Sequence, residues 1–250
     1  MKTFAIASIV CILASGVTAH MQMMDPAPLR SKSNPHTTDA DYSMTSPLLA
    51  DGSNFPCKGY QSLLGTPQGA SVATWQPGEK KNFTLAGTAV HGGGSCQASL
   101  SYDKGKTWTV IESYIGNCPL KNTWDFTVPH DAKAGSALFA WSWFNQVGNR
   151  EMYMNCAAVT IGGAGKGDKV PEVEARDKAE AVELEARAVA FSRRPAMFVA
   201  NVGNGCSTLE GKDVAFPNPG PDVEHGGSNA APPQGNCSDR KRRHARSLNV

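Results

Sequence analysis

The chain has 250 residues, of which 40% are hydrophobic and 18% are charged, and its formal net charge at pH 7 is +2. This length is sufficient for one large domain with a substantial hydrophobic core. The nearly balanced charge argues against a dedicated nucleic-acid binder and against electrostatic capture of an acidic substrate.

The first nineteen residues have the features of a removable secretion signal. Lys2 supplies a positive start, residues 3–14 form a short apolar run, and small residues end at Ala19. The run is too short to remain in a bilayer as a permanent span. We therefore expect cleavage after Ala19, an extracellular protein without membrane association, and His20 as the first residue of the mature chain. There it would carry both an imidazole and a free α-amino group.

The next part of the chain predicts an all-β domain. Residues 21–60 lack sustained periodicity, which indicates a long ordered loop with a short helical turn, laid over a sheet. Further on, short β-prone segments alternate with turn residues, including a hairpin turn at 103–106. The expected strands are 70–75, 82–90, 96–102, 107–115, 123–128, 136–144 and 150–161. Seven such strands predict an antiparallel β-sandwich of the immunoglobulin or fibronectin type III kind, with long loops.

The C-terminal third changes character twice. Residues 172–190 are rich in Ala, Glu and Arg, which predicts an exposed helix within a spacer at about 165–195. Residues 196–237 are rich in Gly, Pro and Asn but contain two cysteines, which indicates irregular structure attached to the domain. The basic residues 238–250 hold too few apolar side chains to pack and are expected to be disordered. The expected organisation is a signal at 1–19, one domain at 20–237 and a tail at 238–250.

The cysteines indicate a disulfide framework. After removal of the signal six cysteines remain, an even number that is typical of secreted proteins: Cys57, Cys96, Cys118, Cys156, Cys206 and Cys237. None forms a CxxC pair, which argues against a structural zinc site. Two N-glycosylation sequons are present. We expect modification at Asn82, and we doubt it at Asn236 because the next residue is a cysteine.

Three further residues combine with His20 to suggest a site. His91 precedes three glycines in the segment AVHGGGSC, so its imidazole would be unshielded, and Cys96 could anchor the loop behind it. Glu151 and Tyr153 lie two residues apart and would point to the same face of a strand. The tyrosine alone could be a packed core residue, but the glutamate beside it is harder to explain by packing.

These residue types suit copper. The α-amine and ring of His20 with the ring of His91 could form a planar, T-shaped set of three nitrogens, an arrangement that Cu(II) prefers. A free α-amine has a pKa of about 7.7 to 8.0, so removing its proton at pH 7 costs only about 1 kcal/mol. A phenol would be a weak axial ligand, and a carboxylate beside it could orient a bound oxygen species.

Six segments of the chain resemble the chitin-active fungal lytic polysaccharide monooxygenases of auxiliary-activity family eleven. They cover most of the mature chain, excluding the Ala/Glu-rich segment and the basic tail. The segments are HMQMMDPAP (20–28), SNFPCKGY (53–60), AVHGGGSCQASLSYDKGKTW (89–108), IGNCP (115–119), DAKAGSALFAWSWFNQVGNREMYMNCA (131–157) and FVANVGNGCSTLEG (198–211).

The resemblance implies one copper ion per chain, held in a histidine brace by His20 and His91 with Tyr153 in an axial position. It also suggests that Ala89 crowds the other axial side and that Glu151 is a polar residue beside the ligands. The implied activity is oxidative cleavage of crystalline chitin or a related polysaccharide, using O2 or H2O2 and an external electron donor. We expect a monomer with a shallow face around the metal rather than a deep pocket.

The family pattern and short loop lengths together imply three disulfides, which pair Cys57 with Cys156, Cys96 with Cys118, and Cys206 with Cys237.

Three other functions are weighed against this interpretation. A hydrolytic glycosidase requires two carboxylates at a defined separation, and the sequence has no recognisable pair. A non-catalytic, secreted copper-binding protein could use the same fold, although Glu151 and Tyr153 favour the enzyme. A plain chitin-binding module would bind chitin without any metal.

Overall fold

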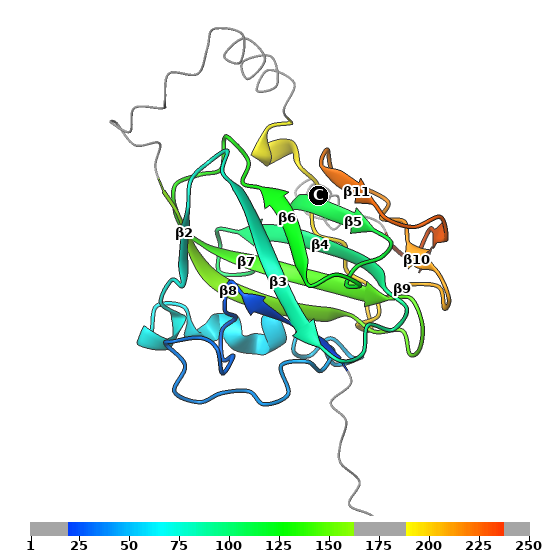
Figure 1. Ribbon diagram of the computed structural model, residues 1–250, viewed down its shortest axis with the longest axis horizontal. Helices are drawn as coiled ribbons and strands as arrows, with labels where there is room; N and C mark the ends of the chain where they lie inside the picture. The colour runs from blue at the N-terminus through cyan, green and yellow to red at the C-terminus, as the bar shows by residue number, and fades with distance from the viewer. Residues whose placement is uncertain (1–19, 163–188, 238–250) are drawn as a thin grey trace, which may run out of the picture.

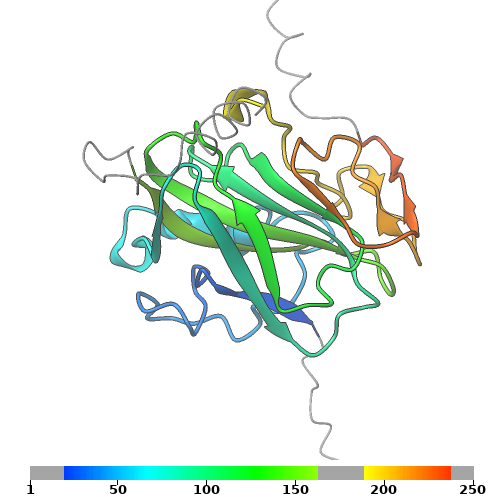
Figure 2. The ribbon, with the colours of Figure 1, turned by 45° about the horizontal axis from the view of Figure 1, so that its top comes forward.

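Two β-sheets face each other in a sandwich (Figures 1 and 2). The computed structural model describes residues 20–162 and 189–237. The smaller sheet has the strand order β1-β3-β6, formed by β1 (Met21–Asp25), β3 (Lys80–Gly87) and β6 (Thr123–Thr127). The larger sheet has the order β11-β5-β4-β7-β8-β2, formed by β2 (Ala73–Trp75), β4 (Gly94–Ser101), β5 (Thr109–Ile115), β7 (Gly135–Asn145), β8 (Tyr153–Ile161) and β11 (Val223–His225).

The remaining elements are short. They are the 3-10 helices η1 (Cys57–Leu63), η2 (Pro67–Gly69) and η3 (Phe191–Arg193), and the two-residue strands β9 (Cys206–Ser207), β10 (Asp213–Val214), β12 (Ala230–Ala231) and β13 (Gln234–Gly235). Among the described residues, no helix is long and apolar enough to cross a membrane.

The predicted sandwich is confirmed, with a correction at the edges of the larger sheet. The sheet is antiparallel from β5 through β8, but β11 pairs in parallel with β5 and β2 pairs in parallel with β8. Both parallel strands have only three residues, so a local turn signal cannot indicate the direction in which they pair. Seven predicted strands correspond to β2 through β8.

The sequence-based prediction missed β1, a strand of the smaller sheet. Residues 21–25 were expected in a loop, but they form β1, which pairs with β3 from Met21 opposite Gly87 to Asp25 opposite Thr84. The reason is the alternation of apolar side chains, since Met21 and Met23 are buried in the sandwich. The rest of the N-terminal segment is a long loop with one helical turn, η1, as predicted.

The larger sheet is covered on both faces, which explains why every residue of β4 is buried. One face packs on the smaller sheet around Trp124, Trp141 and Phe139. The other face packs under the long N-terminal loop, through residues such as Leu29 and Leu48, and under residues 196–216. On this face, the N-terminal loop and residues 196–216 cover the larger sheet, as the smaller sheet does on the other face.

Three predicted segments lie wholly or mostly outside the residues that the structure describes. The signal at 1–19 and the tail at 238–250 lie outside the described residues, as does the helix at 172–190 except for its last two positions. Those two positions are not helical, and η3 follows them. Residues 196–237 contain four two-residue strands, with β11 added to the edge of the larger sheet, so they are more ordered than expected.

Three disulfides cross-link the domain: Cys57–Cys156, Cys96–Cys118 and Cys206–Cys237. They are the pairs that the resemblance implied. Cys96 and Cys118 are both fully buried and are separated by 22 residues. Their bridge joins β4 to the loop after β5, directly behind the loop that carries His91.

Removing the Cys96–Cys118 bridge should lower the free energy of unfolding by about 3 kcal/mol, because the bridge limits the freedom of the unfolded chain. The test is urea unfolding of a variant in which both cysteines are replaced by alanine. The matching variant at Cys206 and Cys237, whose bridge closes a loop of 31 residues, gives a comparison from a more peripheral position. An unchanged midpoint and slope after loss of the buried bridge would contradict this expectation.

A half-buried carboxyl group in β5 makes stability depend on pH. Glu112 lines a cavity of about 530 Å³ with residues of β3 and β6. Burial raises its pKa to about 8, and the nearby carboxylate of Asp222 adds to this, while Arg194 opposes it. The folded protein therefore keeps this proton over a pH range in which the unfolded chain loses it.

The sign of the effect follows from this difference. Above the ordinary glutamate pKa the unfolded state binds fewer protons, so stability falls as the pH rises from about 4.5 to about 8. Replacing Glu112 with glutamine should remove this part of the pH dependence and make the protein more stable than wild type at pH 8 and above. Melting temperatures of both proteins between pH 5 and 9 test this. Parallel curves would contradict it.

Candidate metal centre

His20 lies beside the end of β3 because β1 begins immediately after it. Met21 pairs with Gly87, the last residue of β3. A methyl group on Gly87 would lie only 2.0 Å from the backbone oxygen of His20, so a residue with a side chain would push the two strands apart here. The pairing brings His20 to the connection between β3 and β4, which carries His91. The two imidazole centroids are 5.2 Å apart.

The loop of His91 has a left-handed backbone over three residues, with φ of 47° at His91, 71° at Gly92 and 99° at Gly93. Such a conformation is unusual for a residue with a side chain. Hydrogen bonds from β7 and the loop after it hold this conformation, since the Val147 N–H donates to His91 O at 2.9 Å and the indole N–H of Trp143 donates to Gly93 O at 3.2 Å. His91 was expected at the end of a strand, but β3 ends at Gly87, and Gly94 already belongs to β4.

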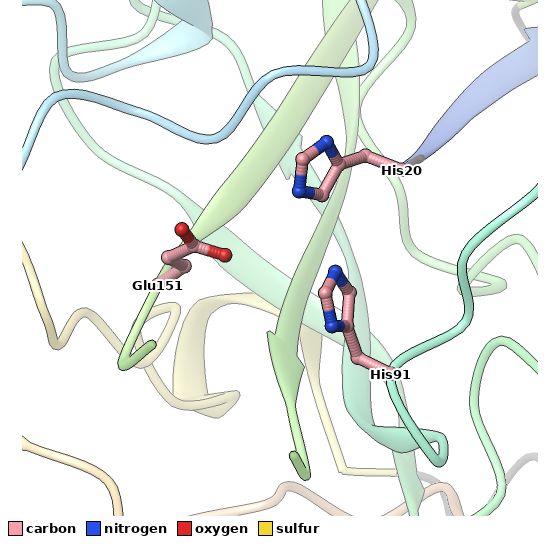
Figure 3. A group of neighbouring side chains, drawn as sticks. All are labelled: His20, His91 and Glu151. Carbon is pink, nitrogen blue, oxygen red and sulfur yellow. The ribbon is translucent and has the colours of Figure 1, made fainter. Parts of the chain in front are cut away.

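Three potential ligands converge at this point. One ligand atom each from His20, His91 and Glu151 lies within 4.8 Å of the other two. Figure 3 shows the two imidazoles facing each other and the carboxylate directed toward the space beside them. Each residue is partly exposed, so the group is open to solvent rather than enclosed.

The imidazole of His91 is prepared to act as a ligand. Burial lowers the pKa of His91, and the charge of His20 adds to this, which favours the neutral form that binds metals. Its Nδ1 side faces the neighbouring loop, where the backbone of Val147 forms a hydrogen bond with the ring. The other nitrogen, Nε2, is buried and has no hydrogen-bond partner among the described residues. A buried nitrogen with an unused lone pair fits a missing metal ion.

Tyr153 and Glu151 are directly coupled. The phenol of Tyr153 donates a hydrogen bond to Glu151 Oε2 at 2.6 Å, and its ring centroid is 5.6 Å from that of His20. Burial raises the pKa of the phenol far above its ordinary value, and the carboxylate of Glu151 raises it further. Tyr153 therefore stays a neutral phenol at all physiological pH values.

Glu151 and Tyr153 do not lie on one strand, as the sequence had predicted. A strand over 150–161 would place both side chains on one face, but β8 begins only at Tyr153. Glu151 lies in the preceding loop, where its N–H donates to the side chain of Asn145 at 3.3 Å. The loop, rather than strand alternation, turns the carboxylate toward the phenol. Ala89 lies two residues before His91 and is partly buried.

Three residues that position the site were not identified from the sequence. Trp143 lies with its ring centroid 4.3 Å from that of Tyr153 and 5.9 Å from that of His91. The side-chain amide of Asn145 donates to the carbonyls of Val147 and Asn149. Arg150 donates to several backbone carbonyls, including those of residues 145, 146, 148 and 209. All three form hydrogen bonds to backbone carbonyls, and no sequence motif identifies residues that act in this way.

The two imidazoles lie outside the two cavities along β3. The cavities have volumes of about 530 and 390 Å³, and their walls contain neither the three converging residues nor Tyr153. The donor set of two imidazoles and one carboxylate suits several transition metals, copper, zinc and iron among them. Geometry alone therefore indicates an open transition-metal centre without naming the metal.

Comparisons with known proteins name the family. No family model matches the chain. The chain is 51% identical over 207 residues to "AA11 family lytic polysaccharide monooxygenase A" of Aspergillus fumigatus, which covers 82% of this chain and 84% of that protein. It is 42% identical to the "AA11 family lytic polysaccharide monooxygenase B" of A. fumigatus and 40% identical to an AA11 family lytic polysaccharide monooxygenase of Aspergillus oryzae. Each alignment covers 86% of this chain but only 51% and 50% of those relatives, so the chain spans about half of their length.

The similar solved structures share less sequence identity with this chain than the relatives above do. A cellulose-active polysaccharide monooxygenase from M. thermophila matches with a TM-score of 0.36 and 18% identity, over 52% of this chain and 67% of that one. The AA10A protein of T. fusca matches with a TM-score of 0.30 and 17% identity, over 46% and 66% of the two chains. The family assignment rests on the sequence relatives, of which the first matches over most of both chains. The chain belongs to the AA11 family of lytic polysaccharide monooxygenases.

Proposed function

We propose that the mature protein is a secreted, copper-dependent monooxygenase that cleaves crystalline chitin oxidatively. The observation that carries the proposal is the pair of facing imidazoles of His20 and His91, with Nε2 of His91 buried and unpartnered. The family membership identifies the reaction class as polysaccharide oxidation. The choice of chitin, and of O2 or H2O2 as the co-substrate, rests on the sequence resemblance.

Copper would be held by the ring and α-amine of His20 and by the ring of His91, with Tyr153 as a further, weak ligand. The α-amine requires cleavage after Ala19. A set of three nitrogens favours copper, whereas two imidazoles and a carboxylate alone would suit iron or zinc equally. When bound and reduced by an external donor, copper supplies one-electron chemistry with O2 or H2O2 that oxidises a C–H bond beside the glycosidic linkage.

The protein's own residues prepare the site for this chemistry. The backbone of Val147 holds the His91 ring so that Nε2 faces the metal position. Glu151 accepts the hydrogen bond of Tyr153, and the phenol keeps its proton. Because a neutral phenol is a poorer metal ligand than a phenolate, Tyr153 would bind copper only weakly. The carboxylate of Glu151 is also close enough to the ligand atoms to hold or orient a proton or water there. Ala89, in our proposal, limits access from the side opposite Tyr153.

Product analysis tests the function. Copper-loaded protein beginning at His20, supplied with ascorbate and either O2 or H2O2, should release oxidised oligosaccharides from β-chitin. Mass spectrometry identifies them, with cellulose as the comparison substrate and metal-free protein as the control. Release from cellulose alone would contradict the choice of chitin. A lack of oxidised products from every polysaccharide would instead favour the non-catalytic copper-binding protein.

Replacing Tyr153 with phenylalanine should alter turnover without removing copper. The ring can still pack on Trp143, and both histidines remain, but Glu151 loses its hydrogen-bond donor. We expect similar copper affinity, a changed spectrum of the Cu(II) form, and a lower rate of product release. Calorimetric titration and electron paramagnetic resonance of the two proteins measure these effects. Complete loss of copper would mean that Tyr153 is more than a weak axial partner.

A further inference from the structure

Two large apolar side chains are exposed next to the His91 loop. Leu120 is 50% exposed in the segment between β5 and β6, and Val147 is 48% exposed in the loop between β7 and β8. Single exposed apolar residues are common and need no explanation. These two come from segments that are distant in sequence, yet both lie against the same short stretch of backbone.

That stretch is the glycine pair after His91. A methyl group on Gly92 would lie 3.0 Å from Val147 Cγ2, and one on Gly93 would lie 3.4 Å from Leu120 Cγ. Both glycines also have positive φ, which a residue with a side chain adopts at a cost. The missing side chains let Val147 and Leu120 lie close to the backbone of the His91 loop.

The segments that carry Leu120 and Val147 are held in place before any ligand binds. The Val147 N–H donates to His91 O at 2.9 Å, and the Cys118 N–H donates to Gly94 O at 3.2 Å. The Leu120 N–H donates to Asn117 O at 2.6 Å, and the Cys96–Cys118 disulfide anchors the same segment. A ligand that contacts these side chains therefore has little chain entropy to overcome.

Nearby charges are paired with each other. Lys121, next to Leu120, forms an ion pair with Glu224 at 3.0 Å. Arg150, in the loop of Val147, forms one with Glu210 at 2.7 Å. In each pair a carboxylate balances the basic side chain beside the apolar residue, which favours an uncharged ligand over a polyanion or a polycation.

We propose that Leu120 and Val147 form an apolar contact surface that binds the nonpolar ring faces of an uncharged crystalline polysaccharide and places it beside His91. The proposal rests on the proposed function and adds the residues that bind the substrate. The axial C–H groups of β-linked sugar rings form flat apolar faces, and an open, rigid apolar surface matches them. Both residues would contact the substrate through their side chains, whereas the contact of Val147 with His91 uses the Val147 backbone.

The test is adsorption of metal-free protein to β-chitin, which needs no catalysis. A variant with Leu120→Asn and Val147→Asn should adsorb at least about tenfold more weakly than wild type, since contact residues at an interface centre contribute most of the affinity. The matched control is Val189→Asn. Val189 is also exposed but lies two residues before Phe191, which packs on Tyr102 after the far end of β4. Adsorption of the control should equal that of wild type.

Copper affinity should be unchanged in the single variant Leu120→Asn, and the melting temperature should be unchanged in the double variant. Each single variant should show part of the loss of adsorption to β-chitin. The single variants provide the test if the double variant has a lowered melting temperature. Equal adsorption of wild type and double variant, with oxidised products from wild type, would overturn the contact surface alone. Adsorption that depends on both side chains, without oxidised products from wild type, would support the contact surface and overturn the monooxygenase proposal.

Discussion

Protein made with one additional residue before His20 should bind copper more weakly by orders of magnitude than protein that begins at His20. The extension leaves the imidazole unchanged and disturbs no buried contact, because β1 starts only at Met21. It converts the α-amine into a peptide amide, which is a poor donor unless it is deprotonated. It also removes the chelate ring between the amine and the imidazole. Oxidative activity should disappear together with the high-affinity site.

Calorimetric copper titration of the two proteins, made from the same chain with and without a leading glycine, measures the difference. The melting temperatures of their metal-free forms should agree, which separates a lost ligand from a damaged fold. Equal affinity and equal activity would show that His20 is an ordinary surface residue after a cleavage site.

Replacing His91 with alanine should reduce copper affinity by at least about a hundredfold, since even residues that only support metal ligands contribute ten- to hundredfold. One of the three proposed nitrogen donors is lost, and it is the one whose Nε2 is buried without a partner. The metal-free fold should change little. Alanine adopts the left-handed backbone less readily than histidine does, but the hydrogen bond from Val147 to residue 91 uses only backbone atoms and remains.

The matched control is His130→Ala. His130 is exposed in the connection between β6 and β7, at the end of β7 opposite Asn145 and the site. Copper affinity should be unaltered in this variant. Undiminished binding in His91→Ala, or an equal loss in both variants, would contradict the assignment of His91 as a ligand.

The sequence predicted the sandwich well because most of its strands are bounded by strong turn residues. The hairpin turn at 103–106 is an example, with positive φ at Lys104 and Gly105. It did not predict β1, since the alternation of Met21 and Met23 is short and is followed by Pro26. It also did not predict the parallel pairing of β2 and β11, which depends on the loops that return the chain to the sheet edges.

The candidate site was predictable to a different extent for each residue. His20 and His91 stand out by their places, one after the expected cleavage site and one before three glycines. Their closeness in space follows from the pairing of β1 with β3, which the sequence did not indicate. The coupling of Glu151 to Tyr153 was predicted from strand alternation, but a loop held by Asn145 produces it. Supports of this kind act through backbone N–H and carbonyl groups, which carry no sequence signature.

The central claim is that the α-nitrogen of His20 is a metal ligand. Electron paramagnetic resonance of the Cu(II)-loaded mature protein tests it, using histidine labelled with ¹⁵N either at the α-nitrogen or in the ring. Only the first residue of the mature chain has a free α-amine, so the α-label reports on His20 alone. We predict that the α-label changes the nitrogen hyperfine pattern by one nucleus and that the ring label changes it by two. A pattern that the α-label leaves unaltered would contradict the histidine brace.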